Sequence, residues 1–316
     1  MAQTIIVDQP LVQVGCILGE GPVWDAKTQM LHFVDISDRK VYHLDTNTLD
    51  TRVDEFDEKI TSIALRPSND GLACTTQSGY ALILPSETAG RPQLQYLTQP
   101  FPSHIQPHTR FNDGACDSRG RYFAGSMWNP SRANEISGKL YRYDPALKAG
   151  DDGCVVLDEG PFTDSNGLGW SPDDRTFYFT DSWAKVIYAY DYDIEAGNIS
   201  NRRPFIDGAA LDLPGMFDGL CVDEEGCIWS AMWDGSHLYR FKEGRVDVVL
   251  EFPKVYRVTS CCFGGPNLDQ LYITTAHCAA EGGDEQLQLK YPDSGHLYKV
   301  DFSGQFRGAP RGVFLE

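Results

Sequence analysis

One short segment type recurs along the chain and limits the folds that the chain can form. In four copies a side chain with a polar oxygen stands directly before a glycine and an apolar, strand-like run, and two weaker copies lack the glycine. Successive copies are 42 to 53 residues apart, and their oxygen-bearing positions are Glu20, Ser62, Asp113, Asn166, Asp218 and Ser260. A repeat period of about 40–50 residues is typical of propellers and solenoids.

Each repeat has the pattern of short antiparallel strands joined by tight Asp/Gly turns. In the third repeat a strand at 114–117 is followed by a turn at 118–120 and by further strands at 121–125 and 138–144. No stretch shows a helical period over three turns. We therefore predict that residues 1–316 form a single all-β domain, a six-bladed β-propeller. The runs at 4–7 and 312–315 are expected to add outer strands that close the ring.

The charge of the chain bears on its partners. The 316 residues carry a formal net charge of −18. Nucleic acids and anionic membranes bind clustered Lys and Arg, so we expect neither as a partner. We expect instead a small-molecule substrate, and a monomer or a weak homo-oligomer.

Cysteine usage and the start of the chain bear on localisation. The nine cysteines form no CxxC pair, and several fall in apolar, strand-like runs. This pattern predicts buried thiols in a reducing compartment. No run approaches the ~20 apolar residues of a membrane helix, and the first residues lack a basic, then apolar, signal pattern. We therefore expect a cytoplasmic protein.

The propeller fold would turn the repeat into a chemical site. The first strand of each blade lines the central channel, so the residues before these strands should meet at one mouth. Glu20, Asp113, Asn166 and Asp218 would then gather three carboxylates and an amide. Such a cluster calls for a divalent cation. Because every donor is an oxygen, Ca²⁺, Mg²⁺ or Mn²⁺ is favoured, with Zn²⁺ and Fe²⁺ still open.

Several ordered motifs resemble a known family. LGEGPVW at 18–24, RFNDG at 110–114, SNGL at 165–168, DGL at 218–220 and TSCCFGG at 259–265 are similar to the SMP-30/gluconolactonase/regucalcin-like family, from about residue 18 to 277. The resemblance implies a six-bladed propeller with a mononuclear divalent-metal site. The metal ligands that it implies are Glu20, Asn166 and Asp218, and the substrate-binding residues are Arg110 and Asn112.

The resemblance also changes the expected role of Asp113, which should lie behind the metal ligands instead of binding the metal. Regucalcin-type members carry a Glu shortly after the Gly-x-Met segment, where this chain has Asn129, so Asn129 is expected to contact substrate in its place. The Pro- and His-rich run 99–108 is a candidate lid over the mouth. Trp183 and Trp233, together with Trp128, are expected at its rim, either stacked on a sugar or simply packed.

The expected reaction is hydrolysis of a sugar lactone, such as a glucono-, xylono-, arabinono- or galactonolactone, to the aldonic acid. The metal would polarise the carbonyl, and Asp218 is the candidate general base. Water activated by the metal itself is the alternative. Two other functions stay open: hydrolysis of organophosphates or other esters on the same fold, and a calcium-binding regulator without catalysis.

Overall fold

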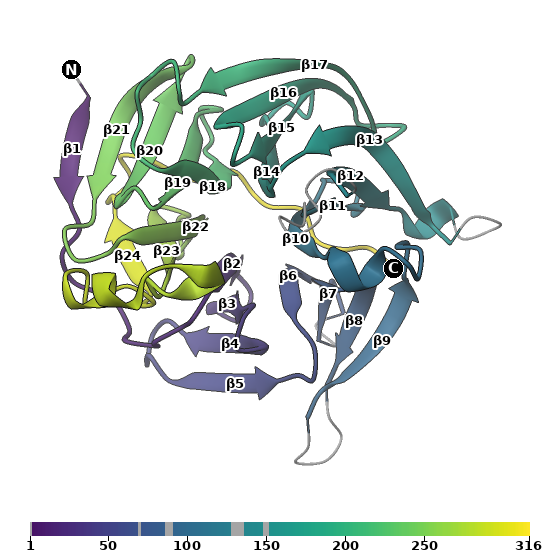
Figure 1. Ribbon diagram of the computed structural model, residues 1–316, viewed down its shortest axis with the longest axis horizontal. Coiled ribbons are helices and arrows are strands. Elements are labelled where there is room, and N and C mark those ends of the chain that lie inside the picture. Colours follow the sequence, from purple (N-terminus) through teal and green to yellow (C-terminus); the bar gives the residue numbers. More distant parts are fainter. Residues whose placement is uncertain (1, 69–70, 86–90, 128–135, 148–151) are drawn as a thin grey trace.

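The computed structural model describes residues 2–68, 71–85, 91–127, 136–147 and 152–316. Within these residues six β-sheets stand in a ring around a central channel, as Figure 1 shows. Each sheet is a meander of consecutive strands, which are numbered outward from the channel. The predicted all-β, six-bladed propeller is therefore confirmed. The described helices are short 3₁₀ turns, at Gln106–His108, Pro145–Leu147, Ala280–Gly282 and Glu285–Leu289.

The first three blades contain four strands each. Blade 1 is β2 (Gly19–Asp25), β3 (Met30–Asp35), β4 (Lys40–Asp45) and β5 (Thr51–Glu55). Blade 2 is β6 (Ile60–Leu65), β7 (Leu72–Thr76), β8 (Tyr80–Leu84) and β9 (Gln93–Thr98). Blade 3 is β10 (Phe111–Cys116), β11 (Tyr122–Ser126), β12 (Gly138–Tyr143) and β13 (Cys154–Phe162).

The other three blades differ in strand number. Blade 4 is β14 (Ser165–Trp170), β15 (Thr176–Asp181), β16 (Val186–Asp193) and β17 (Asn198–Asp207). Blade 5 is β18 (Met216–Val222), β19 (Ile228–Trp233), β20 (His237–Lys242) and β21 (Arg245–Glu251), with β1 (Gln3–Ile6) outside. Blade 6 has three strands in the described chain, β22 (Arg257–Gly264), β23 (Gln270–Ala276) and β24 (Tyr298–Asp301).

Burial follows the position of a strand in its blade. The inner strand β22 is buried along its whole length, whereas β17 at the outer edge of blade 4 is mostly exposed. Apolar side chains from neighbouring blades pack face to face, and one such cluster joins Trp229 and Leu250 of blade 5 to Ile273 of blade 6. Burial of apolar surface between the blades is thus the main force that holds the ring together.

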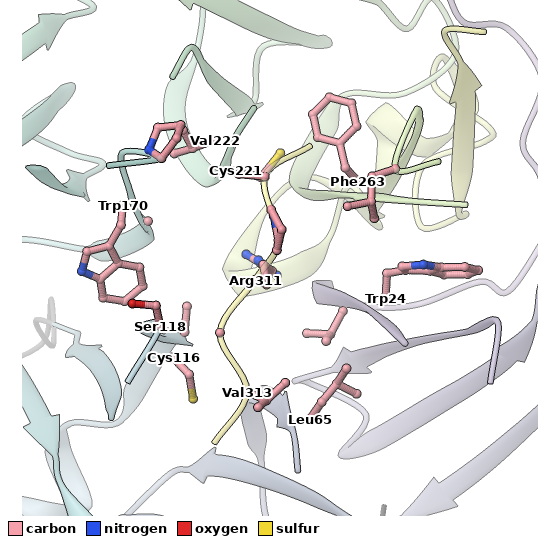
Figure 2. Close-up of a pocket in the computed structure, with 18 of the residues that line it drawn as sticks. Trp24, Leu65, Cys116, Ser118, Trp170, Cys221, Val222, Phe263, Arg311 and Val313 are labelled. Carbon is pink, nitrogen blue, oxygen red and sulfur yellow. The ribbon is translucent and has the colours of Figure 1, made fainter. Parts of the chain in front are cut away.

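The two terminal runs behave differently. The run 4–7 contributes an outer strand, as predicted, because β1 pairs in parallel with β21. It does not close the ring as expected, since β1 adds a fifth strand to blade 5 and no strand to blade 6. The prediction for 312–315 is wrong, since this segment is assigned no strand and instead crosses one end of the channel (Figure 2). Phe314 accounts for this path. Its ring is 1% exposed and packs on Tyr122 and Tyr143, which an exposed sheet edge would not allow.

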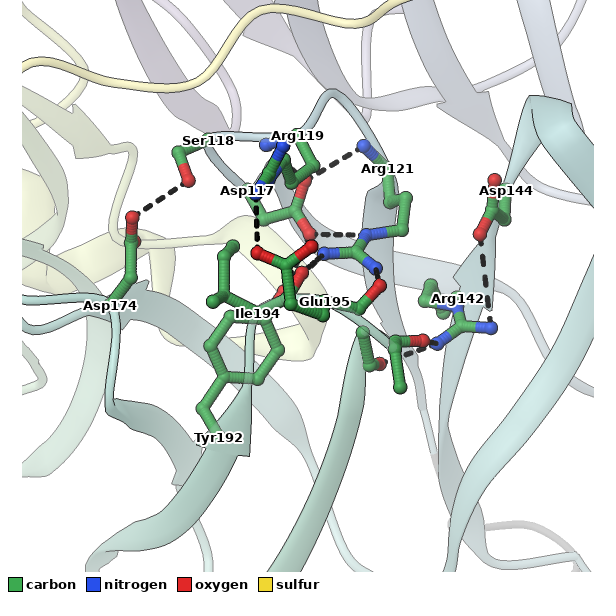
Figure 3. Close-up of polar contacts among 12 residues, drawn as sticks. Asp117, Ser118, Arg119, Arg121, Arg142, Asp144, Asp174, Tyr192, Ile194 and Glu195 are labelled. Atoms are coloured by element: carbon green, nitrogen blue, oxygen red, sulfur yellow. Dashed lines mark hydrogen bonds and ion pairs between the residues drawn. The ribbon is translucent and has the colours of Figure 1, made fainter.

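A buried polar network joins blades 3 and 4 (Figure 3). The Asp117 carboxylate accepts hydrogen bonds from Arg121 Nε (2.6 Å) and Tyr192 Oη (2.5 Å). Arg142 donates to the carbonyl of Gly197 at 2.5 Å. Because Asp117 and Arg121 flank a turn in blade 3 while Tyr192 and Gly197 belong to blade 4, the network fixes the angle between the two blades.

All nine cysteines lie in the described residues and are free thiols, eight of them buried, as the sequence predicts. Over the described parts of the chain, no helix is long and apolar enough to cross a membrane.

Candidate metal centre

The six repeated positions lie on the six inner strands, β2, β6, β10, β14, β18 and β22. These strands are neighbours in a closed ring. In every blade the pairing between the inner and second strands shifts at or beside the repeated position. A β-bulge of this kind turns a side chain out of the regular alternation. The repeated position is therefore the site of a bulge at which each inner strand changes the direction of a polar side chain.

The glycine that follows the oxygen-bearing residue has a packing role. A Cβ atom on Gly167 would lie 2.3 Å from the backbone nitrogen of Leu220, and one on Gly219 would lie 2.2 Å from Ser260 Oγ. Only a residue without a side chain permits such close approach of neighbouring inner strands. In each Asn-Gly or Asp-Gly pair the polar residue thus belongs to the site, and the glycine allows the inner strands to pack closely around it.

A cavity of about 300 Å³ opens at the mouth formed by the first halves of the inner strands. Glu20, Asn166 and Asp218 line it together with Arg110 and Asn112, so the structure gathers five predicted site residues in one place. Glu20, Asn166 and Asp218 are each about 5% exposed. Trp183 and Trp233, which the sequence predicts at the rim, line the same cavity together with Met127 and Ser182.

Two predicted positions, Ser62 and Asp113, are not among the described lining residues of the cavity. Ser62 turns its hydroxyl to Thr75 Oγ1 (2.6 Å) and Tyr122 Oη (2.9 Å), which makes it a link between blades 2 and 3. Asp113 is buried and does not belong to the described lining of the cavity, in keeping with a place behind the ligands. Asn129, like Trp128, falls outside the described residues.

A chain of hydrogen bonds orients Asn166. Arg110 Nη1 donates to Asn112 Oδ1 (2.5 Å), Asn112 Nδ2 donates to Asn166 Oδ1 (2.8 Å), and Asn166 Nδ2 donates to Ser182 Oγ (2.8 Å). Because a guanidinium can only donate, the carbonyl of Asn112 must face Arg110, and this fixes the orientation of both amides. Asn112 therefore positions the Asn166 oxygen as well as lining the cavity.

The acidic side chains in the channel destabilise one another's charged forms. Burial, the Glu20 carboxylate and the Asp113 carboxylate raise the pKa of Asp218 well above its usual range. Burial and Asp113 likewise raise the pKa of Glu20. For Asp113 burial raises the pKa to about 6, while Arg311 and then Arg110 oppose the rise. A cation among these carboxylates would remove the repulsion.

The donor set fits a divalent cation of the hard class. Among the described residues no three His, Cys, Asp or Glu side chains are arranged to hold a metal ion, so the candidate site combines two carboxylates with an amide. Asp164 adds a second indication. Its Oδ1 atom is covered from solvent and has no hydrogen-bond partner in the described part of the chain. Glu20, Asn166 and Asp218 are the residues that could hold the cation.

Comparison with known proteins identifies the family. The sequence profile described as "SMP-30/Gluconolactonase/LRE-like region" matches residues 18–277. The chain belongs to this family. Regucalcin of Gallus gallus is 33% identical over 313 residues, which cover 95% of this chain and 97% of that protein.

Solved structures agree with the SMP-30/gluconolactonase fold. A luciferin-regenerating enzyme superposes with a TM-score of 0.85 at 28% identity, over 97% of this chain and 99% of that chain. A calcium-binding protein, regucalcin from Agrobacterium tumefaciens, superposes with a TM-score of 0.85 over the whole of both chains. At 22% identity the latter supports the fold alone.

The cavity of this family member also holds charged residues that sequence reasoning missed. They are Asp164, Asp234, Arg257 and Glu281. Burial raises the pKa of Asp164 to about 7, and Arg110 opposes the rise. Asp164 stands two residues before Asn166, so the strand alternation could have indicated it. Glu281 lies in an irregular segment, 3.9 Å from Arg110 Nη2, and no sequence pattern points to it.

The run 99–108, which was a candidate lid, does not border the cavity. No residue of 99–108 belongs to the described lining of the cavity, whereas Glu281, Gly282 and Gly283 do. Phe101 explains the difference, since its ring is buried against Phe111 and Tyr141 and holds the run against blade 3.

Proposed function

We propose that this protein is a divalent-metal-dependent hydrolase of sugar lactones, which opens an aldonolactone to the aldonic acid. The observation that carries the proposal is the set of buried oxygens of Glu20, Asn166 and Asp218 in a cavity that also exposes Arg110. Its volume of about 300 Å³ suits a small molecule of monosaccharide size. Membership of a family that includes gluconolactonases supports this substrate class.

Each residue has a distinct part in this reaction. A divalent cation held there supplies Lewis acidity toward the lactone carbonyl. Arg110 is half-buried and lines the cavity, and its guanidinium can donate hydrogen bonds to a substrate oxygen. Asn112 binds a substrate hydroxyl or keeps Asn166 in place through its 2.8 Å hydrogen bond. Asp218 is the candidate general base, which takes a proton from the attacking water.

The bond changes balance within the site. The water oxygen bonds to the carbonyl carbon, the ring C–O bond breaks, and the ring oxygen receives a proton as it leaves. The product is a hydroxy acid that carries one negative charge at neutral pH. Because the cavity is lined by the carboxylates of Glu20, Asp164, Asp218, Asp234 and Glu281, repulsion favours release of this anion.

The test is hydrolysis by metal-stripped protein, with Ca²⁺, Mg²⁺, Mn²⁺, Zn²⁺ and Fe²⁺ restored separately against a panel of aldonolactones. We expect turnover that depends on an added cation and is lost in Asp218→Asn. Ser260→Ala changes another repeated position that is not among the described lining residues, and it should keep its activity. Cation binding without hydrolysis of any lactone would contradict the proposal and favour another ester substrate or a binding role.

A further inference from the structure

A short segment between β23 and β24 carries a charged side chain to the rim of the candidate metal centre. Residues 277–283, named the rim segment here, include Glu281 and the two glycines after it, which line the cavity. The Glu281 side chain is 40% exposed, whereas Glu20 and Asp218 are 5% and 4% exposed. Glu281 therefore stands where the cavity opens to solvent, and the candidate metal ligands lie deeper.

Arg257 holds the rim segment in place. From β22 it donates hydrogen bonds from Nη1 to the carbonyl oxygen of Ala280 at 2.5 Å and from Nε to Asp234 Oδ1 at 2.7 Å. Its guanidinium also lies over the ring of Trp233, 4.2 Å from the ring centroid. Arg257 is 5% exposed, so these contacts are shielded from water and are correspondingly strong. They fix the path of the segment beside the cavity.

The Glu281 side chain extends from blade 6 toward three other blades. Its Oε1 atom lies 3.5 Å from Ser37 Oγ in the turn between β3 and β4. The same atom lies 4.0 Å from Lys59 Nζ, just before β6, and 3.9 Å from Arg110 Nη2, just before β10. These distances are at or beyond the limit of a hydrogen bond. The carboxylate therefore offsets the two cations without being saturated by them, and it can also accept hydrogen bonds from a ligand.

Glu281 decides the sign of the charge at this side of the rim. Without its carboxylate, Lys59 and Arg110 would leave two positive charges there. With the carboxylate in place, a negatively charged group of a ligand is repelled at close range. A hydroxyl group of a ligand can instead donate a hydrogen bond to the carboxylate. The rim therefore favours neutral, hydroxyl-bearing ligands over acidic ones.

We propose that Glu281 is a specificity-determining residue, which makes the site select neutral polyhydroxy lactones over lactones with an acidic group remote from the carbonyl. With the lactone carbonyl at the cation between Glu20 and Asp218, the other end of the substrate lies at the rim beside Glu281. There the carboxylate binds hydroxyl groups and repels an acidic group. The inference rests on the proposed function, since it assumes a lactone bound in this orientation.

The kinetic test compares D-glucono-1,4-lactone with D-glucaro-1,4-lactone, in which a carboxylate replaces the terminal hydroxymethyl group. Both are offered at pH 7 in the cation that gives the highest rate. The wild type should prefer the neutral lactone. Glu281→Gln should improve kcat/KM for the anionic lactone relative to the neutral one by about tenfold, mainly through KM, because screening at this exposed side chain limits the effect. The gain should shrink as NaCl is raised.

Glu243→Gln is the matched control. Glu243 lies in the turn between β20 and β21, is exposed, and is not among the described residues that line the cavity. Its φ of 51° is close to the 46° of Glu281, so both variants make the same chemical change at a left-handed backbone position. The ratio of the two lactones should stay at the wild-type value in Glu243→Gln.

A binding measurement gives a readout that does not need turnover. Gluconate and glucarate are polyhydroxy acids with one and two carboxylates, and each is titrated calorimetrically into the same cation-loaded protein, or into protein in MnCl₂ where no cation supports turnover. The wild type should bind gluconate more tightly than glucarate. Glu281→Gln should reduce this difference by about tenfold, and Glu243→Gln should leave it unchanged.

The outcomes distinguish the inference from the proposed function. If the wild type opens neither lactone but shows the binding difference, and Glu281→Gln reduces it, the proposed function is wrong and the role of Glu281 stands. If the wild type hydrolyses lactones but prefers the anionic one, or if Glu281→Gln keeps the wild-type ratio, the role is overturned while the function stands. Neither turnover nor binding would overturn both. Glu281→Ala, a second neutral variant, carries the same expectation if the glutamine variant does not fold.

Discussion

Asp164→Asn should make the cation-free protein more stable at alkaline pH. The wild-type residue buries a carboxylate oxygen without a partner, and burial raises its pKa from 3.8 to about 7. Between these two values the unfolded chain has lost the proton and the folded chain has kept it. The free energy of unfolding therefore falls as pH rises from about 4 to about 7, and asparagine removes this dependence.

The size of the effect follows from the difference between the two pKa values. At 1.36 kcal/mol for each unit of pKa difference, the shift from 3.8 to about 7 corresponds to about 4 kcal/mol of unfolding free energy. Asp164 as a whole is only half-buried, although its Oδ1 atom is covered, so we take about half of this value. The predicted gain for Asp164→Asn at pH 8 is thus about 2 kcal/mol, with little gain at pH 4.

Urea unfolding in EDTA at pH 4, 6 and 8 measures this gain. Asp50→Asn is the control, since it makes the same chemical change at an exposed position. The reasoning is refuted if Asp164→Asn and the wild type differ by the same amount at every pH, or if the variant is the less stable protein at pH 8. In saturating cation the difference should shrink, because the bound charge stabilises the wild-type carboxylate.

Three further predictions concern the site and the fold. Asp218→Asn should abolish turnover, and a near-wild-type rate with cation bound would show that Asp218 is neither an essential ligand nor the base. Asn112→Ala should mainly raise KM; loss of cation binding with substrate affinity intact would reject the substrate-binding role in favour of the link to Asn166. Burial and the neighbouring His43, 2.7 Å away, lower the pKa of His32 to about 3. The unfolded chain binds this proton below about pH 6.5 and the folded chain does not, so acidification to pH 5 should cost about 2 kcal/mol of stability. Urea unfolding of His32→Asn should show a flatter response between pH 7 and pH 5, and an equal slope would count against this explanation.

The sequence predicted the blades and much of the site because both repeat. The alternation of strands and Asp/Gly turns recurs in each blade, and the ring follows from the number of copies. Glu20, Asn166 and Asp218 could be found together because each occupies the same bulged position on an inner strand. Because each of these residues is followed by a glycine, the repeated motif can be recognised in a single sequence.

What the sequence could not predict lies outside the repeat. Glu281 reaches the cavity from an irregular segment between β23 and β24, where no periodicity fixes the path. Residues 312–315 look like a strand in sequence, and the burial of Phe314 against Tyr122 and Tyr143 decides their course instead.

Manganese binding followed by electron paramagnetic resonance tests the central claim most directly. The metal-stripped protein should bind one Mn²⁺ per chain, Asp218→Ala should lose it, and Ser260→Ala should keep it. One tightly bound Mn²⁺ in Asp218→Ala, or none in the unchanged protein, would contradict the assignment of Glu20, Asn166 and Asp218 as the metal centre.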